Sequence, residues 1–144
     1  MARIDYYEIQ NAIKIMLDAD STLLGVKNRL EAPDLITENC PQTVIILKSR
    51  NNILEEIAAG QHIRMGITFE VWCYEYALEI LQAMKKRDDL IGKVEIALMK
   101  NRTLNSTVQY HTITGGEFEN VQSANFGWIS GGSIVLVAEQ QANI

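Results

Sequence analysis

The sequence predicts an α+β fold, in which residues 1–144 form a single domain with a mostly antiparallel sheet and two main helices packed against it. The chain of 144 residues has a common length for one domain. Residues 4–19 and 77–100 repeat apolar residues at helical spacing, whereas residues 62–74 alternate apolar and polar residues as a one-sided strand does. With 47% hydrophobic and 22% charged residues, the composition is that of a globular rather than a disordered protein.

The first predicted element is an amphipathic helix over residues 4–19. Its apolar stripe consists of Ile9, Ala12, Ile13, Met16 and Leu17. Asp5, followed three residues later by Glu8, resembles a capping box, in which side chains bond the free backbone N–H groups of a helix start. Ile15 lies off the stripe, which leaves it free to be covered by a second surface.

A short strand is expected at residues 26–30, and a strand buried on both faces at residues 42–48, whose two side-chain parities are both apolar. Residues 49–60 are then interpreted as a connection, long for a hairpin. This apolar loop carries Ile53, Leu54 and Ile57, which a solvated loop does not need. One alternative is that the three residues fold back on the sheet as a helical turn.

Residues 62–74 give the clearest pattern in the chain, because every odd position from 63 to 73 is apolar. Such strict alternation predicts a strand with one core face. At about 3.3 Å per residue the strand would be roughly 43 Å long, about twice a typical strand. A strand of that length either projects beyond its own domain or belongs to a sheet shared with neighbours.

Residues 77–100 are predicted to be helical, as one bent helix or two abutting ones. The expected apolar stripe is Ile80, Leu81, Met84, Ile91, Val94 and Leu98. Gly92 is expected to weaken the helix by about 1 kcal/mol relative to Ala. A second long strand is expected at residues 107–114, an aromatic loop at residues 115–132 with Phe118, Phe126 and Trp128, and a closing strand at residues 133–139.

Charge and hydropathy argue against several classes of protein. The net charge of −5 and the sequence pI of 5.0 argue against a dedicated nucleic-acid binder or a binder of anionic membranes. The longest apolar runs, such as residues 44–47, are far shorter than the roughly 20 residues of a membrane span. The first residues show no signal-peptide pattern, and Cys40 and Cys73 are expected as free thiols of a reducing compartment. The chain is therefore expected to be made in a cytoplasm.

A metal site or a catalytic nucleophile is not predicted. His62 and His111 stand alone on separate expected strands, where a strand-face or surface position is the ordinary interpretation, and the chain has no CxxC, HxxxH or HExxH spacing. There is no Gly-x-Ser-x-Gly elbow, and Cys40 has no electropositive group near it in the sequence to lower its pKa.

Phosphate and paired-carboxylate sites are not predicted either. The glycine pairs 115–116 and 131–132 do not precede a helix, so they lack the helix N-terminus that binds phosphate. The adjacent carboxylates at 55–56 and 88–89 would point about 100° apart on a helix and could not easily share a proton or a metal. We therefore expect no cofactor, no metal and no enzymatic activity.

The layout of the whole chain resembles the tail terminator (tail-completion) proteins of long-tailed bacteriophages, a group typified by the minor tail protein U of lambda. The resemblance lies in the order of the following features: the amphipathic opening at residues 4–9, the alternating strand that leads into Trp72 and Tyr74, the helix segment 87–98 before residues 102–104, the Gly-Gly-Glu-Phe at 115–118 and the closing segment 131–139. It covers nearly all of the chain, and no catalytic or metal signature is part of it.

The resemblance implies a subunit of a homo-oligomeric ring, expected as a hexamer, on the head-proximal end of the tail tube. Such a ring stops tube growth and presents a surface to the head connector, or neck protein. Its partners are then further copies of itself, the tail tube protein and the connector, and DNA passes through the lumen without specific binding. The protein would be assembled in the bacterial host cytoplasm and end in the virion tail.

Two sets of residues are candidates for these contacts. The expected tube or partner contacts are Ile53, Leu54, Ile57, Phe118, Phe126 and Trp128. The expected contacts between subunits are the charged residues Lys85, Lys86, Arg87, Asp88 and Asp89, where opposite signs could pair across an interface.

Two other classes of function stay open at this point. One is a head–tail joining or tail tube protein of the same machine, which differs in closure because a tube protein grows into a filament whereas a terminator ring stays discrete. The other is a small enzyme or ligand-binding domain, which would need a deep pocket with converging polar groups.

Overall fold

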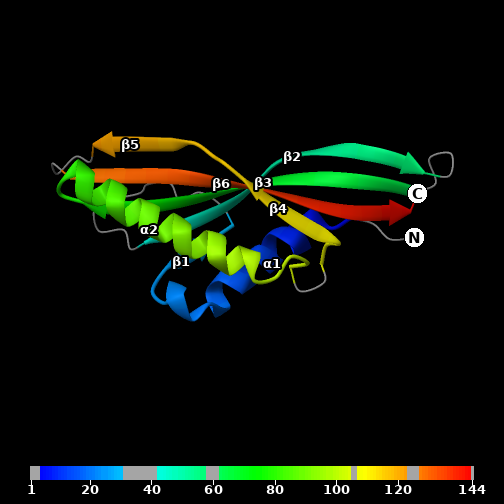
Figure 1. The fold of residues 1–144 in the computed structure, drawn as a ribbon, viewed down its shortest axis with the longest axis horizontal. Helices are drawn as coiled ribbons and strands as arrows, with labels where there is room; N and C mark the ends of the chain where they lie inside the picture. The colour runs from blue at the N-terminus through cyan, green and yellow to red at the C-terminus, as the bar shows by residue number, and fades with distance from the viewer. Residues whose placement is uncertain (1–3, 31–41, 58–61, 105–106, 123–126, 144) are drawn as a thin grey trace.

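The computed structural model describes residues 4–30, 42–57, 62–104, 107–122 and 127–143. It confirms the α+β class: one mostly antiparallel sheet carries two helices on one face (Figure 1). In chain order the elements are α1 (Tyr6–Ala19), the 3-10 turn η1 (Ser21–Leu23), β1 (Lys27–Arg29), β2 (Thr43–Ile57), β3 (His62–Ala77), α2 (Ile80–Met99), β4 (Tyr110–Thr114), β5 (Phe118–Gln122) and β6 (Trp128–Asn143).

The strands lie in the order β1-β2-β3-β6-β4, and β5 also pairs with β6. Only the β1–β2 pair is parallel; all other pairs are antiparallel. The first part of β6 pairs with β5 and its later part with β4, so that β4 and β5 follow each other along one edge. Residues 115–117 separate them, and Gly116 is needed there because a Cβ atom would lie 1.9 Å from the carbonyl oxygen of Ser133.

The alternation predicted for residues 62–74 is confirmed in β3. The residues Met65, Ile67, Phe69, Val71 and Cys73 are buried and face the helices. Ile63, the second residue of β3, is only half-buried. The strand is longer than predicted and continues to Ala77.

Helix α1 forms as predicted. The carboxylate of Asp5 accepts a hydrogen bond of 3.1 Å from the backbone N–H of Glu8, which is the N-cap interaction expected at a helix start. The helix buries Ile9, Ala12, Ile13 and Leu17 against the sheet. Ile15 is 50% exposed, so the described residues do not cover it.

Helix α2 is one continuous helix of 20 residues, but its buried face differs from the predicted stripe in its first half. Leu81 is 65% exposed, whereas Arg87 is buried. In this first half Arg87 faces the sheet, where it donates to the hydroxyl of Ser130. Further along, a Cβ atom on Gly132 would lie 2.6 Å from Cδ1 of Ile91, so the helix packs there against bare backbone.

Three predicted segments are wrong in their boundaries. Residues 49–57 are not an apolar loop but the second half of β2, which passes two register shifts, between Lys48 and Arg50 and between Ile53 and Glu55. The expected loop at 115–132 contains β5 and the start of β6. The expected strand at 107–114 begins only at Tyr110. The error in β2 arises because its residues 48–56 are exposed on both faces, where a strand tolerates polar residues.

His111 lies on strand β4, as expected of a strand-face position, and its side chain is fully buried. Its Nε2 lies 3.0 Å from the carbonyl oxygens of Leu98 and Asn101, so Nε2–H donates to both and closes the C-terminal end of α2. Burial lowers the pKa of His111, and its Nδ1 has no hydrogen-bond partner among the described residues.

Candidate functional site

The ends of β2, β3 and β6 extend beyond both helices and form one extremity of the molecule (Figure 1). We call this part, residues 50–57, 62–66 and 139–143, the distal end. Every described side chain of β2 from Lys48 to Glu56 is exposed. The candidate residues Ile53 and Leu54 are 53% and 39% exposed within this segment. Ile57 ends β2, and its side chain lies outside the described residues.

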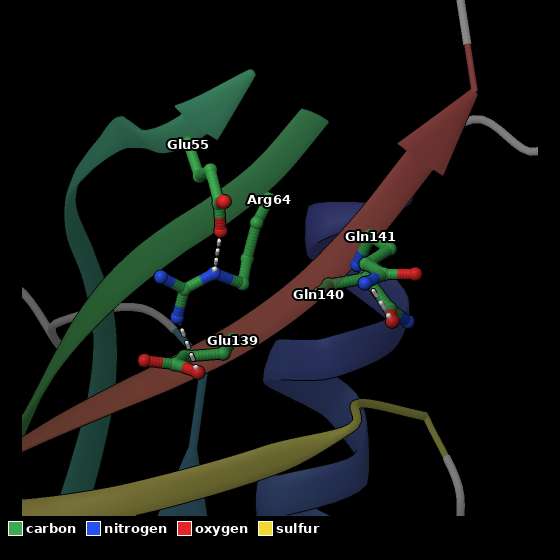
Figure 2. Close-up of polar contacts among 5 residues, drawn as sticks. All are labelled: Glu55, Arg64, Glu139, Gln140 and Gln141. Atoms are coloured by element: carbon green, nitrogen blue, oxygen red, sulfur yellow. Dashed lines mark hydrogen bonds and ion pairs between the residues drawn. The ribbon is translucent and has the colours of Figure 1, made fainter. Parts of the chain in front are cut away.

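An ion-pair bridge joins the three strands of the distal end (Figure 2). Arg64 of β3 lies between Glu55 of β2, with Nε 3.5 Å from a carboxylate oxygen, and Glu139 of β6, with a terminal nitrogen at 3.1 Å. All three side chains are partly exposed, so each pair contributes at most about 1 kcal/mol. The bridge links the three strands at this end of the sheet.

Ile53 and Leu54 belong to opposite faces of the distal end. Ile53 is paired with the buried Met65 of β3. It therefore lies on the face of the sheet that the helices cover further along β3. Leu54 lies at the register shift and leans over β3, where its methyl carbons come within 3.3–3.4 Å of the point that a Cβ of Gly66 would occupy. The distal end therefore exposes apolar surface on both sides.

The charged cluster on α2 is divided by the fold. Lys85, Lys86, Asp88 and Asp89 are exposed, as a contact between subunits would require. Arg87 is 5% exposed, which corrects its expected role: it is directed into its own chain and is not available to a neighbouring subunit.

Arg87 instead joins α2 to the sheet. A terminal nitrogen donates to the hydroxyl of Ser130 on β6 at 2.9 Å, and the guanidinium also pairs with Asp88 at 3.0 Å. It lies 4.4 Å from the ring centre of Phe118 on β5. Phe118, expected in a loop, is thus an exposed strand residue held beside α2.

The remaining aromatic candidates are placed differently. Trp128 is the first residue of β6 and is half-buried, whereas Phe126 lies outside the described residues. An aromatic row that the sequence did not single out as a site lies on the sheet face away from the helices, where Trp72 and Tyr74 stack with ring centres 6.0 Å apart. The ring of Tyr74 covers Gly131, and burial raises its pKa to about 12.

Titratable groups inside the fold do not converge on a reaction centre. Among the described residues no three His, Cys, Asp or Glu side chains are grouped as metal ligands. Cys73 is a buried free cysteine, and burial raises the pKa of its thiol; Cys40 lies outside the described residues. Glu75 is buried beside Gln42, whose amide donates to it, and desolvation raises its pKa. In the described part of the chain no helix is both long and apolar enough to span a membrane.

Comparisons with solved structures find distant likenesses, of which two are described here. No family model matches the chain, and no curated protein matches it in sequence. A similar solved structure is the sheath/tube terminator of an extracellular contractile injection system, PVC, in the extended state, with 14% identity and a TM-score of 0.49. That match covers 100% of this chain and 59% of the other, so this chain spans about three fifths of its length. A chain of the virion of a native gene transfer agent particle matches with 8% identity and a TM-score of 0.42, over 90% of this chain and 93% of the other.

Proposed function

We propose that the protein is a structural, non-enzymatic component of a phage-type tail, which forms a ring on the head-proximal end of the tail tube. The ring stops polymerisation of the tube and provides the surface to which the head connector joins. The observation that carries the proposal is the distal end, the end of a three-stranded part of the sheet that exposes Ile53 and Leu54. Apolar side chains exposed at the end of a sheet are typical of a surface that is completed by another subunit.

Electrostatics suit a ring around DNA. Six copies at −5 each would carry a net charge of −30 and have a mass of about 97 kDa. An acidic ring repels the phosphate backbone, so DNA can pass through the lumen without specific binding. The sequence order that resembles the tail terminators supports this function over that of a tube protein, and the partners would be further copies of the chain, the tube protein and the connector.

The test is a double substitution at the distal end, Ile53→Ser with Leu54→Ser, in a phage that depends on this protein. Because both side chains are exposed in the monomer, the variant should fold with nearly unchanged stability. Tails measured by electron microscopy should then vary in length or fail to join heads. Leu24→Ser, at a position 79% exposed near α1, is the matched control and should give normal tails.

Two outcomes would contradict the proposal at different levels. If the folded double variant gives tails of normal length that join heads, the distal end is not the contact surface. If removal of the whole protein leaves tail length and head joining unchanged, the terminator function itself is wrong. Growth of the purified protein into filaments would favour the tube protein alternative, because a terminator ring closes.

A further inference from the structure

The solvent-facing side of α2 carries a glycine, Gly92, at a position where no neighbouring atom among the described residues requires one. A Cβ atom on Gly92 would meet nothing within 4 Å, and the residue is in the middle of a 20-residue helix. Glycine weakens a helix interior because its backbone has more freedom to lose. At Gly132, by contrast, the missing side chain makes room for Ile91 of the same chain. The space above Gly92 is therefore left open towards solvent.

Gly92 lies on a single stripe of exposed side chains. The stripe follows helical spacing of four and three residues, and we call it the outer face of α2: Leu81, Lys85, Asp88, Gly92, Ile96 and Met99. Leu81, Ile96 and Met99 are 65%, 60% and 46% exposed. Large apolar side chains on both sides of an open glycine are what a helix presents when another backbone packs closely against it.

A second copy packed through the same face does not fit this stripe. If the α2 helices of two copies crossed antiparallel with Gly92 at the centre, a residue before Gly92 in one helix would face the residue the same number of positions after Gly92 in the other. Asp88 would then lie opposite Ile96, and Lys85 opposite Met99, so that both charged side chains would lose water against apolar side chains. The outer face of α2 therefore requires a different surface.

The distal end has the complementary chemistry. The outer face carries two charges: Asp88 pairs with Arg87 of its own helix, whereas Lys85 makes no ion pair among the described residues. In β2 the exposed pair Ile53 and Leu54 is followed directly by the exposed Glu55 and Glu56. The outer face has the same division into an apolar part, Ile96 and Met99, and a charged part that contains Lys85.

We propose that the distal end of one copy docks on the outer face of α2 of the next copy, with its backbone crossing at Gly92. Ile53 packs beside Ile96 and Met99, and Glu56, which lies on the same face of β2 as Ile53, approaches Lys85. Neither Glu56 nor Lys85 makes an ion pair among the described residues. Helix α2 lies along one half of the long axis and the distal end is the extremity of the other half (Figure 1). Two different patches that meet in this way propagate from copy to copy, which is the type of interface a ring needs.

The inference rests on the proposed ring and names its interface, so its test uses the purified protein and not the phage. The wild-type protein is expected to form a discrete oligomer by mass measurement at about 100 µM. Gly92→Ala should raise the melting temperature of the monomer at low concentration by about 3–5 °C, because it improves the helix. The same variant should weaken oligomer formation by roughly tenfold or more, because the Cβ fills the space of the partner's backbone. Gly115→Ala, at another glycine with nothing within 4 Å, is the matched control and should assemble normally.

Mixing two blocked variants identifies the occupant of the outer face. Gly92→Trp blocks the α2 face and Ile53→Asp blocks the distal end, so each variant alone should be a monomer. In a mixture, the intact distal end of one meets the intact α2 face of the other, and a dimer of one copy each, about 32 kDa, is expected. Lys85→Glu should also weaken assembly, and Glu56→Lys in the same chain should restore it.

Three results would overturn the inference: a wild-type protein that stays monomeric at that concentration, normal assembly of Gly92→Ala, or normal assembly of Ile53→Asp. None of them affects the tail-length test of the proposed function. Conversely, the purified protein could form a ring through this interface while phage that lack the protein still make normal tails. That result would refute the terminator function but support the proposed interface.

Discussion

Replacing Phe69 by Ala tests whether the alternation in β3 defines the core. Phe69 is 0% exposed at the centre of β3, where it belongs to the cluster formed by both helices and the sheet. Truncation of a fully buried phenylalanine costs about 3–5 kcal/mol, from lost transfer free energy and from the cavity left behind. For a domain whose total stability is about 5–15 kcal/mol, this is a large fraction of the free energy of unfolding.

The assay is urea unfolding followed by circular dichroism. With a slope of roughly 2 kcal/mol per M, the midpoint should fall by about 2 M in the Phe69→Ala variant. Phe118→Ala is the matched control, since Phe118 is 61% exposed and lies beside Arg87 at the surface. It should cost about 1 kcal/mol or less. Equal losses at the two positions would refute the assignment of the core face.

Two further predictions concern buried polar groups. Burial lowers the pKa of His111 in the folded state, so below the unfolded value of about 6.5 the unfolded chain binds more protons than the folded chain. The free energy of unfolding should therefore fall as the pH drops from 7 to 5.5. Urea titrations across that pH range measure the change. His111→Gln should reduce the dependence of the free energy of unfolding on pH in this range. His62→Gln, at an exposed position, should leave that dependence unchanged. If His111→Gln also leaves it unchanged, other groups cause the pH dependence. Arg87→Met should cost about 2 kcal/mol because it removes the hydrogen bond to Ser130 and the pair with Asp88, whereas Lys85→Met on the same helix should change stability by about 0.5 kcal/mol or less. Equal effects of the two methionine substitutions would contradict the role given to Arg87.

The parts of the fold that could be predicted are those in which one surface is apolar and lies in the core, and the other carries mostly polar side chains. In β3 and α1 the hydrophobic period follows directly from that contrast, and Asp5 marks the start of α1 through its own side chain. The second half of β2 has no such contrast, because both of its faces are exposed from Lys48 to Glu56. Its polar residues therefore resemble those of a loop, although the backbone stays paired with β3 as far as Ile57.

The candidate contacts could be predicted only in part for a related reason. The sequence shows which side chains are apolar or charged, but burial decides which of them are free to contact a partner. Arg87 looks like its neighbours Lys86 and Asp88 in the sequence, yet only Arg87 faces Ser130, which comes from a strand 43 residues further along the chain. A contact at that distance leaves no local pattern, and no feature of residues 85–89 could have indicated it.

The glycines show the same separation between local pattern and packing. Gly131 and Gly127 lie under the rings of Tyr74 and Tyr76, so the absence of a side chain serves contacts within the chain. Gly92 costs the helix about 1 kcal/mol relative to Ala and serves no such contact among the described residues. The lower helix stability at Gly92 is explained if the missing side chain allows a close contact at an interface between subunits. The exposed Ile96 on the same face is explained by the same interface, because one partner backbone close to Gly92 would cover it.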